Sequence, residues 1–303
     1  MILEERFYQQ PPYYQNTLRQ AVRLQEQYPW LRVFSYGRSV LGRDILAYGV
    51  GQRQDAVCYI GGVHGSEWLT VLLLYRFLGE LAAALEEGGS VAQVDARQAM
   101  EHSGLLVVPA LNPDGIEISL RGPAGALWKA GEIAPLIYTP RPQYWQSNAN
   151  GVDLNHNFPA GWEEIHQLEV EAGITGPSHT RYGGPYPFSE PETRAVRRRF
   201  AACLPRYVIA FHSQGEVIYY QYGEHTPPQS ELMAQVLAAS SGYALSQPEG
   251  LAGGAGLKDW FIERHRRPGF TVEIGRGQNP LPVSDFEPIY QQLQEMLMLG
   301  LLL

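Results

Sequence analysis

The chain has 303 residues, of which 45% are hydrophobic and 18% charged, and its formal net charge is -8 with a pI of about 5.5. This composition is typical of a folded globular protein and excludes a disordered chain. The acidic excess argues against nucleic acid or an anionic membrane as a main partner.

Several features of the sequence favour a cytoplasmic protein. No apolar run approaches the ~18 residues that a membrane span needs. The first residues lack the basic and apolar regions of a signal peptide. Cys58 and Cys203 lie in apolar contexts, so we expect buried free thiols, not a disulfide, which fits a reducing compartment.

The first half of the chain predicts strands and helices in alternation. A surface helix over residues 15–28 ends near Pro29 and is followed by strands over 32–36 and 44–50, joined by a glycine turn. A strand over 56–60, helices over 69–85 and 91–102, a strand over 105–109 and a turn at 112–115 come next. This order is typical of an α/β fold with a largely parallel or mixed sheet and helices on both faces.

The second half begins with a different composition. Residues 121–187 are rich in Gly, Pro, Asn, Tyr and Trp without clear periodicity, and we interpret them as ordered loops that line a cleft. The predicted elements that follow are a helix over 190–203, a strand over 207–211, a helix over 230–241, a glycine-rich loop, a short helix to 264, a strand over 269–274 and a helix over 285–301. No repeat or linker divides the chain, so one domain over 1–303 is expected.

A metal site is predicted where the strand at 56–60 runs through a glycine turn into the next helix. His64 and Glu67 are three residues apart, and on the first turn of a helix they can bind the same ion. His212 directly follows a second strand, and site residues gather at the carboxyl ends of strands in such sheets. Two histidines and one glutamate leave a fourth zinc position for water, as in catalytic sites. The competing interpretation is that each histidine is an ordinary core or surface residue.

Glu273 is the candidate general base. It stands among β-forming residues at the end of the strand at 269–274, where a solvated surface charge is hard to explain. Hydrolysis at a zinc site needs such a group to carry a proton. The alternative is a structural ion pair, for example with Arg276.

These features together resemble the zinc carboxypeptidase family. The resemblance covers nearly the whole chain, from the segment Gly37–Arg43 to the last helix, and its landmarks occur in the family's order: His64-Gly-Ser-Glu67, Asn112-Pro-Asp-Gly115, Gly151-Val-Asp-Leu-Asn155-His156-Asn-Phe158, His212-Ser213 and Glu273. It implies one zinc ion bound by His64, Glu67 and His212, with Glu273 as general base and proton shuttle. It also implies a mixed, mostly parallel eight-stranded sheet flanked by helices.

The sequence departs from the family at the substrate. His156 stands where family carboxypeptidases have an arginine that binds the C-terminal carboxylate, and histidine is mostly neutral at pH 7. A mobile family tyrosine has no evident match. Lys129, with Arg121 as its rival, takes the place of the arginine that polarises the scissile carbonyl. For Lys129 an exposed surface position is an equally good interpretation.

Three segments resemble the bacterial γ-D-glutamyl-L-diamino acid endopeptidases: 145–159, 181–193 and 212–220. These enzymes cleave the bond between D-glutamate and diaminopimelate or lysine in cell-wall peptides. Candidate ligands for the substrate carboxylates are Arg276, His156 and Asn155, and Glu216 is the candidate for its ammonium group. Each of these could equally be a loop residue with only a hydrogen-bonding role.

The predicted function is therefore a zinc peptidase that acts on soluble cell-wall peptides, in recycling or in a developing spore. The alternatives are a metallocarboxypeptidase of ordinary peptides and a catalytically inactive muropeptide-binding protein. An amidohydrolase of N-acyl amino acids would share the metal centre but not the similarity outside it.

Overall fold

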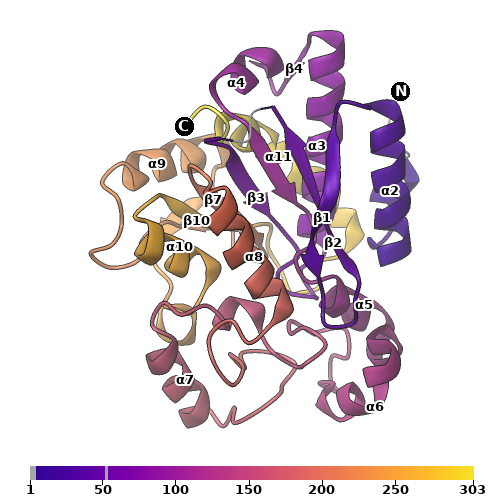
Figure 1. Ribbon diagram of the computed structural model, residues 1–303, viewed down its shortest axis with the longest axis vertical. Coiled ribbons are helices and arrows are strands. Elements are labelled where there is room, and N and C mark those ends of the chain that lie inside the picture. Colours follow the sequence, from indigo (N-terminus) through magenta and orange to yellow (C-terminus); the bar gives the residue numbers. More distant parts are fainter. Residues whose placement is uncertain (1–4, 52–53) are drawn as a thin grey trace.

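The computed structural model describes residues 5–51 and 54–303. Its centre is an eight-stranded sheet with the strand order β1-β2-β6-β3-β7-β10-β8-β9 (Figure 1). The strands are β1 (Arg32–Arg38), β2 (Asp44–Val50), β3 (Val57–Ile60), β6 (Leu105–Val108), β7 (Val208–His212), β8 (Val217–Tyr219), β9 (Ala244–Ser246) and β10 (Gly269–Glu273). The four central strands β6, β3, β7 and β10 are parallel, while β1, β2 and β8 pair antiparallel with a neighbour. The α/β fold with a mixed sheet is confirmed.

Helices cover both faces of this sheet (Figure 1). Apolar residues of α2 (Tyr14–Gln27), α3 (Leu69–Glu87), α9 (Ser230–Ser241) and α11 (Phe286–Leu299) form the core on one face. On the other face, α8 (Pro191–Ala202) and α10 (Leu257–His265) pack against the sheet. The remaining helices are α1 (Glu5–Tyr8), α4 (Ala96–His102), α5 (Pro113–Arg121), α6 (Ala130–Ile133) and α7 (Trp162–Glu171). In the described part of the chain, no helix is long and apolar enough to cross a membrane.

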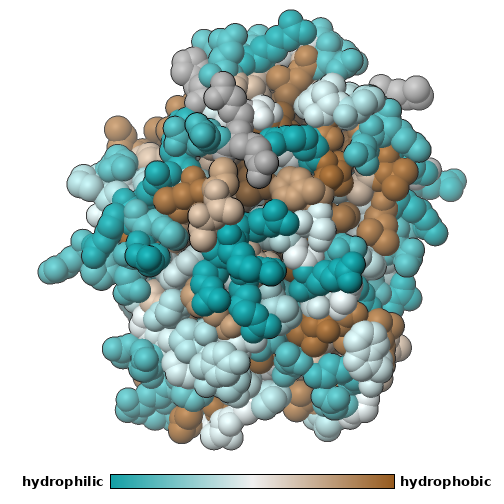
Figure 2. Space-filling view, viewed as in Figure 1, coloured by the Kyte–Doolittle hydropathy of each residue, from teal (hydrophilic) through white to brown (hydrophobic). Residues whose placement is uncertain are grey.

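The sequence of α8 explains its position. Ala195, Val196 and Phe200 are buried against the sheet, whereas Arg197 and Arg198 are exposed. Figure 2 shows hydrophilic side chains gathered across the middle of this face, where Figure 1 places α8. This two-sided pattern is that of an amphipathic surface helix, and it fixes which face of α8 turns to the core.

Several predicted elements have different bounds in the structure. The helix predicted over 91–102 begins only at Ala96, because residues 90–95 form a small hairpin of β4 (Ser90–Val91) and β5 (Val94–Asp95), and the side chain of Asp95 caps the helix. The predicted turn at 112–115 is the start of α5, with Asn112 as its N-cap. Of the two cysteines, Cys58 is buried as expected, but Cys203 is only partly buried.

The region 121–187 contains more regular structure than predicted. It holds 3₁₀ segments at Gly122–Lys129, Ala134–Leu136 and Leu154–His156 as well as α6 and α7. The sequence did not predict the strands β8 and β9. They have three residues each, too few to show a periodic pattern.

A buried acidic cluster joins α5 and α8 to the segment after β1. Asp114 binds Arg43 (Nη1–Oδ1, 2.6 Å), Ser39 (2.8 Å) and the backbone N–H of Leu41 (2.8 Å). Glu192 accepts hydrogen bonds from the N–H of Val40 (3.1 Å) and from the side chain of Asn148. Burial, together with the nearby Asp114 carboxylate, raises the pKa of Glu192 to about 8.

We predict that Glu192 makes the stability of the protein depend on pH. Its pKa is higher in the folded state than in the unfolded state, so its contribution is complete below about pH 4.5 and is lost as the pH rises through 8. The free energy of unfolding of Glu192→Gln should therefore equal that of the wild type near pH 4.5. At pH 8.5 the variant should be more stable than the wild type by a few kcal/mol. Urea unfolding across this pH range measures the difference.

The matched control is Glu295→Gln, because Glu295 is an exposed acid on the surface of α11. Its unfolding curves should follow the wild type at every pH. A constant difference between Glu192→Gln and wild type from pH 4.5 to 8.5 would contradict the prediction.

Candidate metal centre and adjoining cavity

The predicted site residues lie at or just beyond the carboxyl ends of three neighbouring parallel strands, at one edge of the sheet. His64 lies four residues beyond the end of β3, while His212 and Glu273 are the last residues of β7 and β10. His212 and Glu273 are register partners in the β7–β10 ladder. Paired positions on adjacent strands direct their side chains to the same face of the sheet, so the register places these two side by side.

The loop between β3 and α3 holds the other two donors. His64 and Glu67 lie in a hydrogen-bonded turn that precedes α3, not in its first turn as the sequence predicted. A Cβ on Gly65 would lie 2.2 Å from the carbonyl oxygen of Gly115, so only glycine permits this close approach. The side chain of Asn112 donates to the carbonyl oxygens of Val63 (3.1 Å) and Ser147 (3.1 Å). The Asn-Pro-Asp-Gly segment thus anchors the loop.

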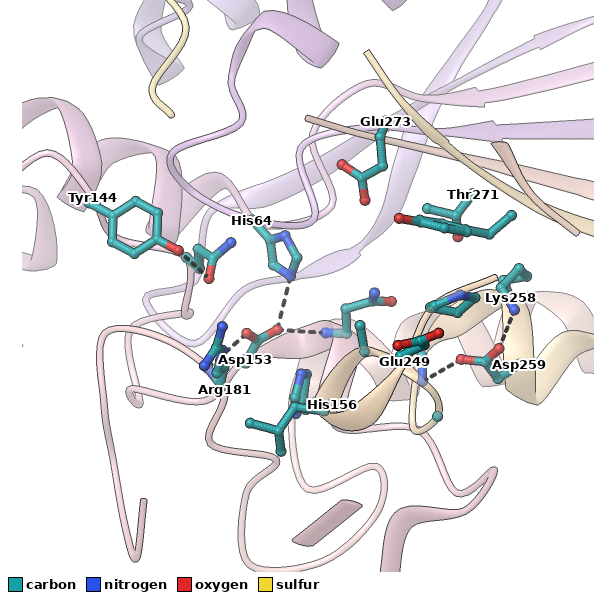
Figure 3. A pocket seen from close by; sticks show the side chains of 18 residues that line it. His64, Tyr144, Asp153, His156, Arg181, Glu249, Lys258, Asp259, Thr271 and Glu273 are labelled. Carbon is teal, nitrogen blue, oxygen red and sulfur yellow. Dashed lines mark hydrogen bonds and ion pairs between the residues drawn. The ribbon is translucent and has the colours of Figure 1, made fainter. Parts of the chain in front are cut away.

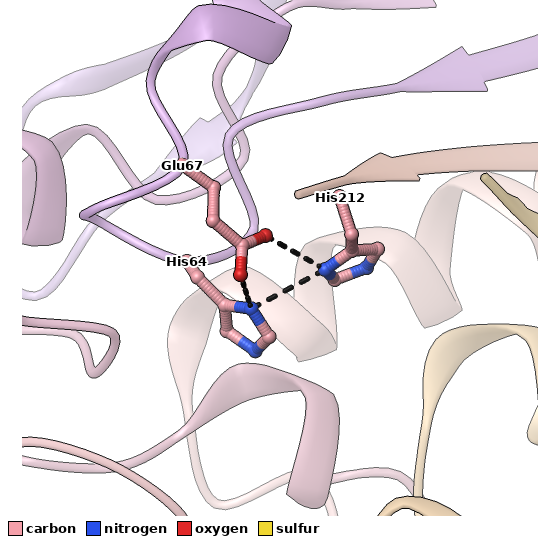
Figure 4. A group of neighbouring side chains, drawn as sticks. All are labelled: His64, Glu67 and His212. Atoms are coloured by element: carbon pink, nitrogen blue, oxygen red, sulfur yellow. Dashed lines mark hydrogen bonds and ion pairs between the residues drawn. The ribbon is translucent and has the colours of Figure 1, made fainter. Parts of the chain in front are cut away.

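His64, Glu67 and His212 meet at one point (Figure 4). Their donor atoms all lie within 4.8 Å of one another. Glu67 Oε1 is 2.8 Å from His64 Nδ1, Glu67 Oε2 is 3.0 Å from His212 Nδ1, and the two Nδ1 atoms are 3.3 Å apart. All three side chains are nearly inaccessible to solvent.

Asp153 fixes the tautomer of His64. The Nε2–H of His64 donates to Asp153 Oδ1 at 3.0 Å, and Nδ1 is the ring nitrogen that faces His212 and Glu67. The same carboxylate also accepts from the backbone N–H groups of Asn155 (3.0 Å) and Arg181 (2.9 Å). Asp153 therefore orients one metal donor and two segments of the neighbouring cavity.

The electrostatics of the cluster show how closely its charges interact. Burial works to lower the pKa of His64, but Glu67 and Asp153 outweigh it and hold that pKa well above its ordinary value. Burial works to raise the pKa of Glu67, and His64 and His212 overcome it, which lowers the pKa to about 2. Glu67 is accordingly an ionised carboxylate between two imidazoles.

This donor set fits a zinc ion. A tetrahedral ion with bonds of about 2.0–2.1 Å has edges of roughly 3.3 Å between its ligands, and the two Nδ1 atoms are 3.3 Å apart. Among the residues that the structure describes, His212 Nε2 is buried without a hydrogen-bond partner, while its Nδ1 faces the cluster. His64, Glu67 and His212 would hold the ion, and three protein ligands are the number found in catalytic zinc sites.

A polar cavity of about 420 Å³ opens beside the cluster (Figure 3). Its wall includes His64 and Glu273, so one of the three metal donors and the candidate base face the same space. Side chains of both charges line it: Arg181, Lys258, Asp153, Glu249 and Asp259. Burial and the nearby Glu67 carboxylate raise the pKa of Glu273 well above its ordinary value, which favours a carboxyl group that can hold and release a proton.

The predicted substrate residues lie in two different environments. Asn155 and His156 line the cavity. Lys129 is bonded to Asn150 (2.6 Å) and Glu132 (3.1 Å), and Arg121 to Glu117 (2.8 Å). Arg276 and Glu216 are paired with each other at 2.5 Å, with the Arg276 side chain 78% exposed.

In the part of the chain that the structure describes, the cavity wall contains none of the four residues Lys129, Arg121, Arg276 and Glu216. Their assignments to substrate stay predictions, and the geometry gives no support to them.

Sequence analysis missed several residues that the fold brings to the cavity. Gln146 lies next to the cluster, with Nε2 3.4 Å from Glu67 Oε1, and its carbonyl oxygen accepts from Thr180 and from Tyr144. Arg181 lines the same wall. Both come from the region without periodicity, and the signal for them was that they lie in the segments 145–159 and 181–193, which resemble the endopeptidases.

Comparisons with known proteins agree with this geometry. A profile of the family described as zinc carboxypeptidase matches residues 18–296. The chain belongs to the zinc carboxypeptidase family. It is therefore a metallopeptidase, and the sequence-based assignment to this family is confirmed.

Two named relatives and one solved structure show how far the similarity extends. The chain is 36% identical over 291 residues to gamma-D-glutamyl-L-diamino acid endopeptidase 1 of Lysinibacillus sphaericus, which covers 96% of this chain and 72% of the relative. It is 28% identical over 180 residues to murein peptide amidase A of Escherichia coli, covering 58% of this chain and 57% of the relative. The fold matches bovine thrombin-activatable fibrinolysis inhibitor with a TM-score of 0.75 at 20% identity over 97% of both chains.

We predict that zinc stabilises the folded protein. Zinc at 100 times its dissociation constant adds about 2.7 kcal/mol if it binds the folded state alone. For a chain of this size that corresponds to a melting temperature raised by roughly 4 °C. Thermal melts of chelator-stripped protein with and without added zinc measure the shift, and elemental analysis should find one zinc per chain.

His212→Gln should abolish the zinc response, because it removes one of the three donors. His225→Gln is the control, since His225 lies on the surface between Tyr222 and Glu263. An undiminished zinc shift in His212→Gln would contradict the assignment of the metal donors.

Proposed function

We propose that this metallopeptidase hydrolyses the amide bond between the γ-carboxyl group of D-glutamate and a diamino acid in peptidoglycan-derived peptides. The observation that carries the proposal is that His64, one of the three clustered metal donors, and Glu273 line one cavity with charges of both signs. A diaminopimelate residue in such a peptide carries carboxylates and an ammonium group, which suit this wall. The similarity to a γ-D-glutamyl-L-diamino acid endopeptidase over 96% of the chain supports the same substrate.

The charged groups divide the cavity into regions (Figure 3). Asn155 and His156 lie on the wall near Asp153 and are the groups we assign to a substrate carboxylate. Lys258 and Asp259 lie together on another part of the wall and form a buried ion pair. A cation and an anion side by side complement a zwitterion, and the distal end of diaminopimelate is one, whereas lysine ends in an ammonium group alone. We therefore propose diaminopimelate over lysine as the diamino acid.

The reaction requires one proton to move from water to the leaving amine. When bound, zinc supplies Lewis-acid polarisation and lowers the pKa of water. Glu273 takes a proton as the water oxygen forms its bond to the γ-carbonyl carbon, and it gives that proton to the amine nitrogen as the carbon–nitrogen bond breaks. The products are a γ-glutamyl carboxylate and a free diamino acid.

Gln146 is our candidate for stabilising the carbonyl oxygen in the transition state. Its Nε2 lies beside Glu67, and the bonds from Thr180 and Tyr144 to its Oε1 keep the amide in that orientation. A neutral donor that is held in place can stabilise a developing oxyanion. Arg181 provides a permanent positive charge on the same wall.

The proposed reaction predicts release of free diaminopimelate from L-Ala-γ-D-Glu-meso-diaminopimelate by zinc-loaded protein. Mass spectrometry detects it, and a chelator should abolish it. Glu273→Gln should lower kcat by about 10²–10⁴-fold with little change in KM, because it removes proton transfer but keeps the cavity wall.

Two control peptides test the specificity of this reaction. The same tripeptide with an α-linked glutamate should be cleaved more slowly, and so should the γ-linked peptide that carries lysine. Equal or faster cleavage of the α-linked peptide would instead identify an ordinary metallocarboxypeptidase. Binding without cleavage of either peptide would identify a muropeptide-binding protein.

A separate prediction concerns the group that stabilises the oxyanion. Gln146→Ala should lower kcat by about 10²–10³-fold, the usual effect of removing one oxyanion donor. Lys129→Ala and Arg121→Ala are the comparisons, and both should retain most of the kcat. If one of them loses activity and Gln146→Ala does not, the role belongs to that cation.

A further inference from the structure

Arg181 is a cation of the cavity wall whose side chain has no acidic partner. It lines the cavity and is exposed to solvent. Among the residues that the structure describes, its guanidinium group makes no ion pair and no hydrogen bond, and only its backbone N–H is bonded, to Asp153. Lys258, which also lines the wall, is instead buried and paired with Asp259. The charge of Arg181 is therefore available to a ligand.

The backbone of Arg181 is held in place by the carboxylate that also holds His64. Oδ2 of Asp153 accepts from the N–H of Arg181 at 2.9 Å, and the N–H of Asp153 donates to the carbonyl oxygen of Tyr182 at 2.7 Å. Oδ1 of the same carboxylate is 3.0 Å from Nε2 of His64. The base of the Arg181 side chain thus has a fixed position relative to a metal donor, while its guanidinium group is unpaired in the cavity.

The backbone conformation does not explain why this residue is an arginine. Its φ of 63° lies in the left-handed region, which glycine and asparagine adopt more readily than residues with long side chains. The bonds of residues 181 and 182 to Asp153 are made by the main chain, so the arginine side chain adds nothing to them. A residue type that the backbone disfavours, at the wall of a candidate site, indicates a role for the side chain itself.

Arg181 lies toward the end of the cavity away from the Lys258–Asp259 pair. Figure 3 shows Arg181 and that pair on opposite sides of His64. The residue before Arg181 donates to the side-chain oxygen of Gln146, the group that we assign to the scissile carbonyl. Because the diamino acid is assigned to the Lys258–Asp259 end, the acyl residue of the substrate extends from the carbonyl toward Arg181.

A γ-linked glutamate carries a free carboxylate on this acyl side. It is joined to the diamino acid through its side-chain carboxyl group, so its α-carboxylate is separated from the scissile carbonyl carbon by Cγ, Cβ and Cα. A guanidinium group is a planar fork of donors that matches a carboxylate and stays charged at every physiological pH. The amidated form of the residue, D-isoglutamine, has neither the charge nor the second acceptor oxygen.

We propose that Arg181 binds the free α-carboxylate of the D-glutamyl residue and makes the enzyme select substrates in which this group is not amidated. The inference deepens the proposed function, and it rests on that function in taking the acyl residue to be a γ-linked glutamate. Arg181 is then a specificity residue that acts on substrate binding, while Gln146, Glu273 and the metal centre carry out the reaction.

The test compares two tripeptides that differ in one group. They are L-Ala-γ-D-Glu-meso-diaminopimelate and its α-carboxamide, with kcat and KM measured separately for each. Zinc-loaded wild type should prefer the acid by about tenfold in kcat/KM, mostly through KM, because a charge-assisted pair at a partly exposed site is lost with the carboxamide. The preference should shrink as salt is added, since the pair is accessible to solvent.

Arg181→Asn should abolish this preference by raising the KM of the acid, with kcat and the KM of the carboxamide little changed. Asparagine tolerates the left-handed backbone, so the variant keeps the main-chain bonds to Asp153. Arg181→Lys keeps the charge without the fork and should retain part of the preference. Arg198→Gln is the matched control, because Arg198 is an exposed arginine of α8 outside the cavity wall, and it should behave as the wild type.

Three results would overturn the proposal. The first is equal cleavage of both peptides by the wild type. The second is a fall in kcat by the same factor on both peptides in Arg181→Asn, which would assign the arginine to the oxyanion or to the charge balance around Asp153. The third is an equally large effect of Arg198→Gln. Thermal melts show whether Arg181→Asn folds, and the first result decides the question without any variant.

A binding experiment separates failure of this inference from failure of the proposed function. Zinc-loaded wild type and Arg181→Asn protein are titrated calorimetrically with L-Ala-γ-D-Glu and with its α-carboxamide, which need no cleavage and no diamino acid. Tighter binding of the acid, lost in Arg181→Asn, supports the role of Arg181 even if the tripeptide is never hydrolysed. Equal binding of acid and carboxamide overturns that role even if the tripeptide is a substrate.

Discussion

The carboxylate of Asp153 connects the metal centre of this zinc carboxypeptidase family member to its cavity. One oxygen accepts from His64 Nε2 and the other from the N–H of Arg181. Burial acts to raise the pKa of Asp153, but His64 and His156 hold it below the ordinary value, so the group is ionised. Because a buried carboxylate is stable only with its partners in place, the position of the metal donor and the position of the substrate wall depend on each other.

Buried polar side chains of the Asn-Pro-Asp-Gly segment hold the metal loop in place. Asn112 donates to the carbonyl oxygens of Val63 in the metal loop and of Ser147 in a distant segment. Asp114 binds Arg43 and Ser39 in the segment after β1. This explains two sequence landmarks that carry no chemistry themselves. Their polar side chains are buried in a network in which each group satisfies another, and such networks favour one geometry over its alternatives.

The cavity wall combines side chains of both charges. Arg181 and Lys258 line it together with Asp153, Glu249 and Asp259. Behind the wall, Glu169 of the short helix α7 is 2.8 Å from Nδ1 of His156, which lies 13 residues earlier in the chain. The substrate wall is therefore built largely by segments between the regular elements of the sheet, which is where binding residues commonly lie on a rigid scaffold.

By itself, the sequence determined the α/β class, six of the eight strands and the ordered set of landmarks around His64, Glu67, His212 and Glu273. These are readable because burial against a core leaves a period in the chain, and because a metal needs particular donors at strand ends.

Only the tertiary structure decided that Gln146, Arg181 and Glu169 approach the site, and that Lys129 and Arg121 bind neighbouring side chains outside the cavity wall. Those positions follow from how irregular segments fold over one another. Contacts between residues distant in the chain, made by loops without a repeating pattern, leave no signal in the local sequence.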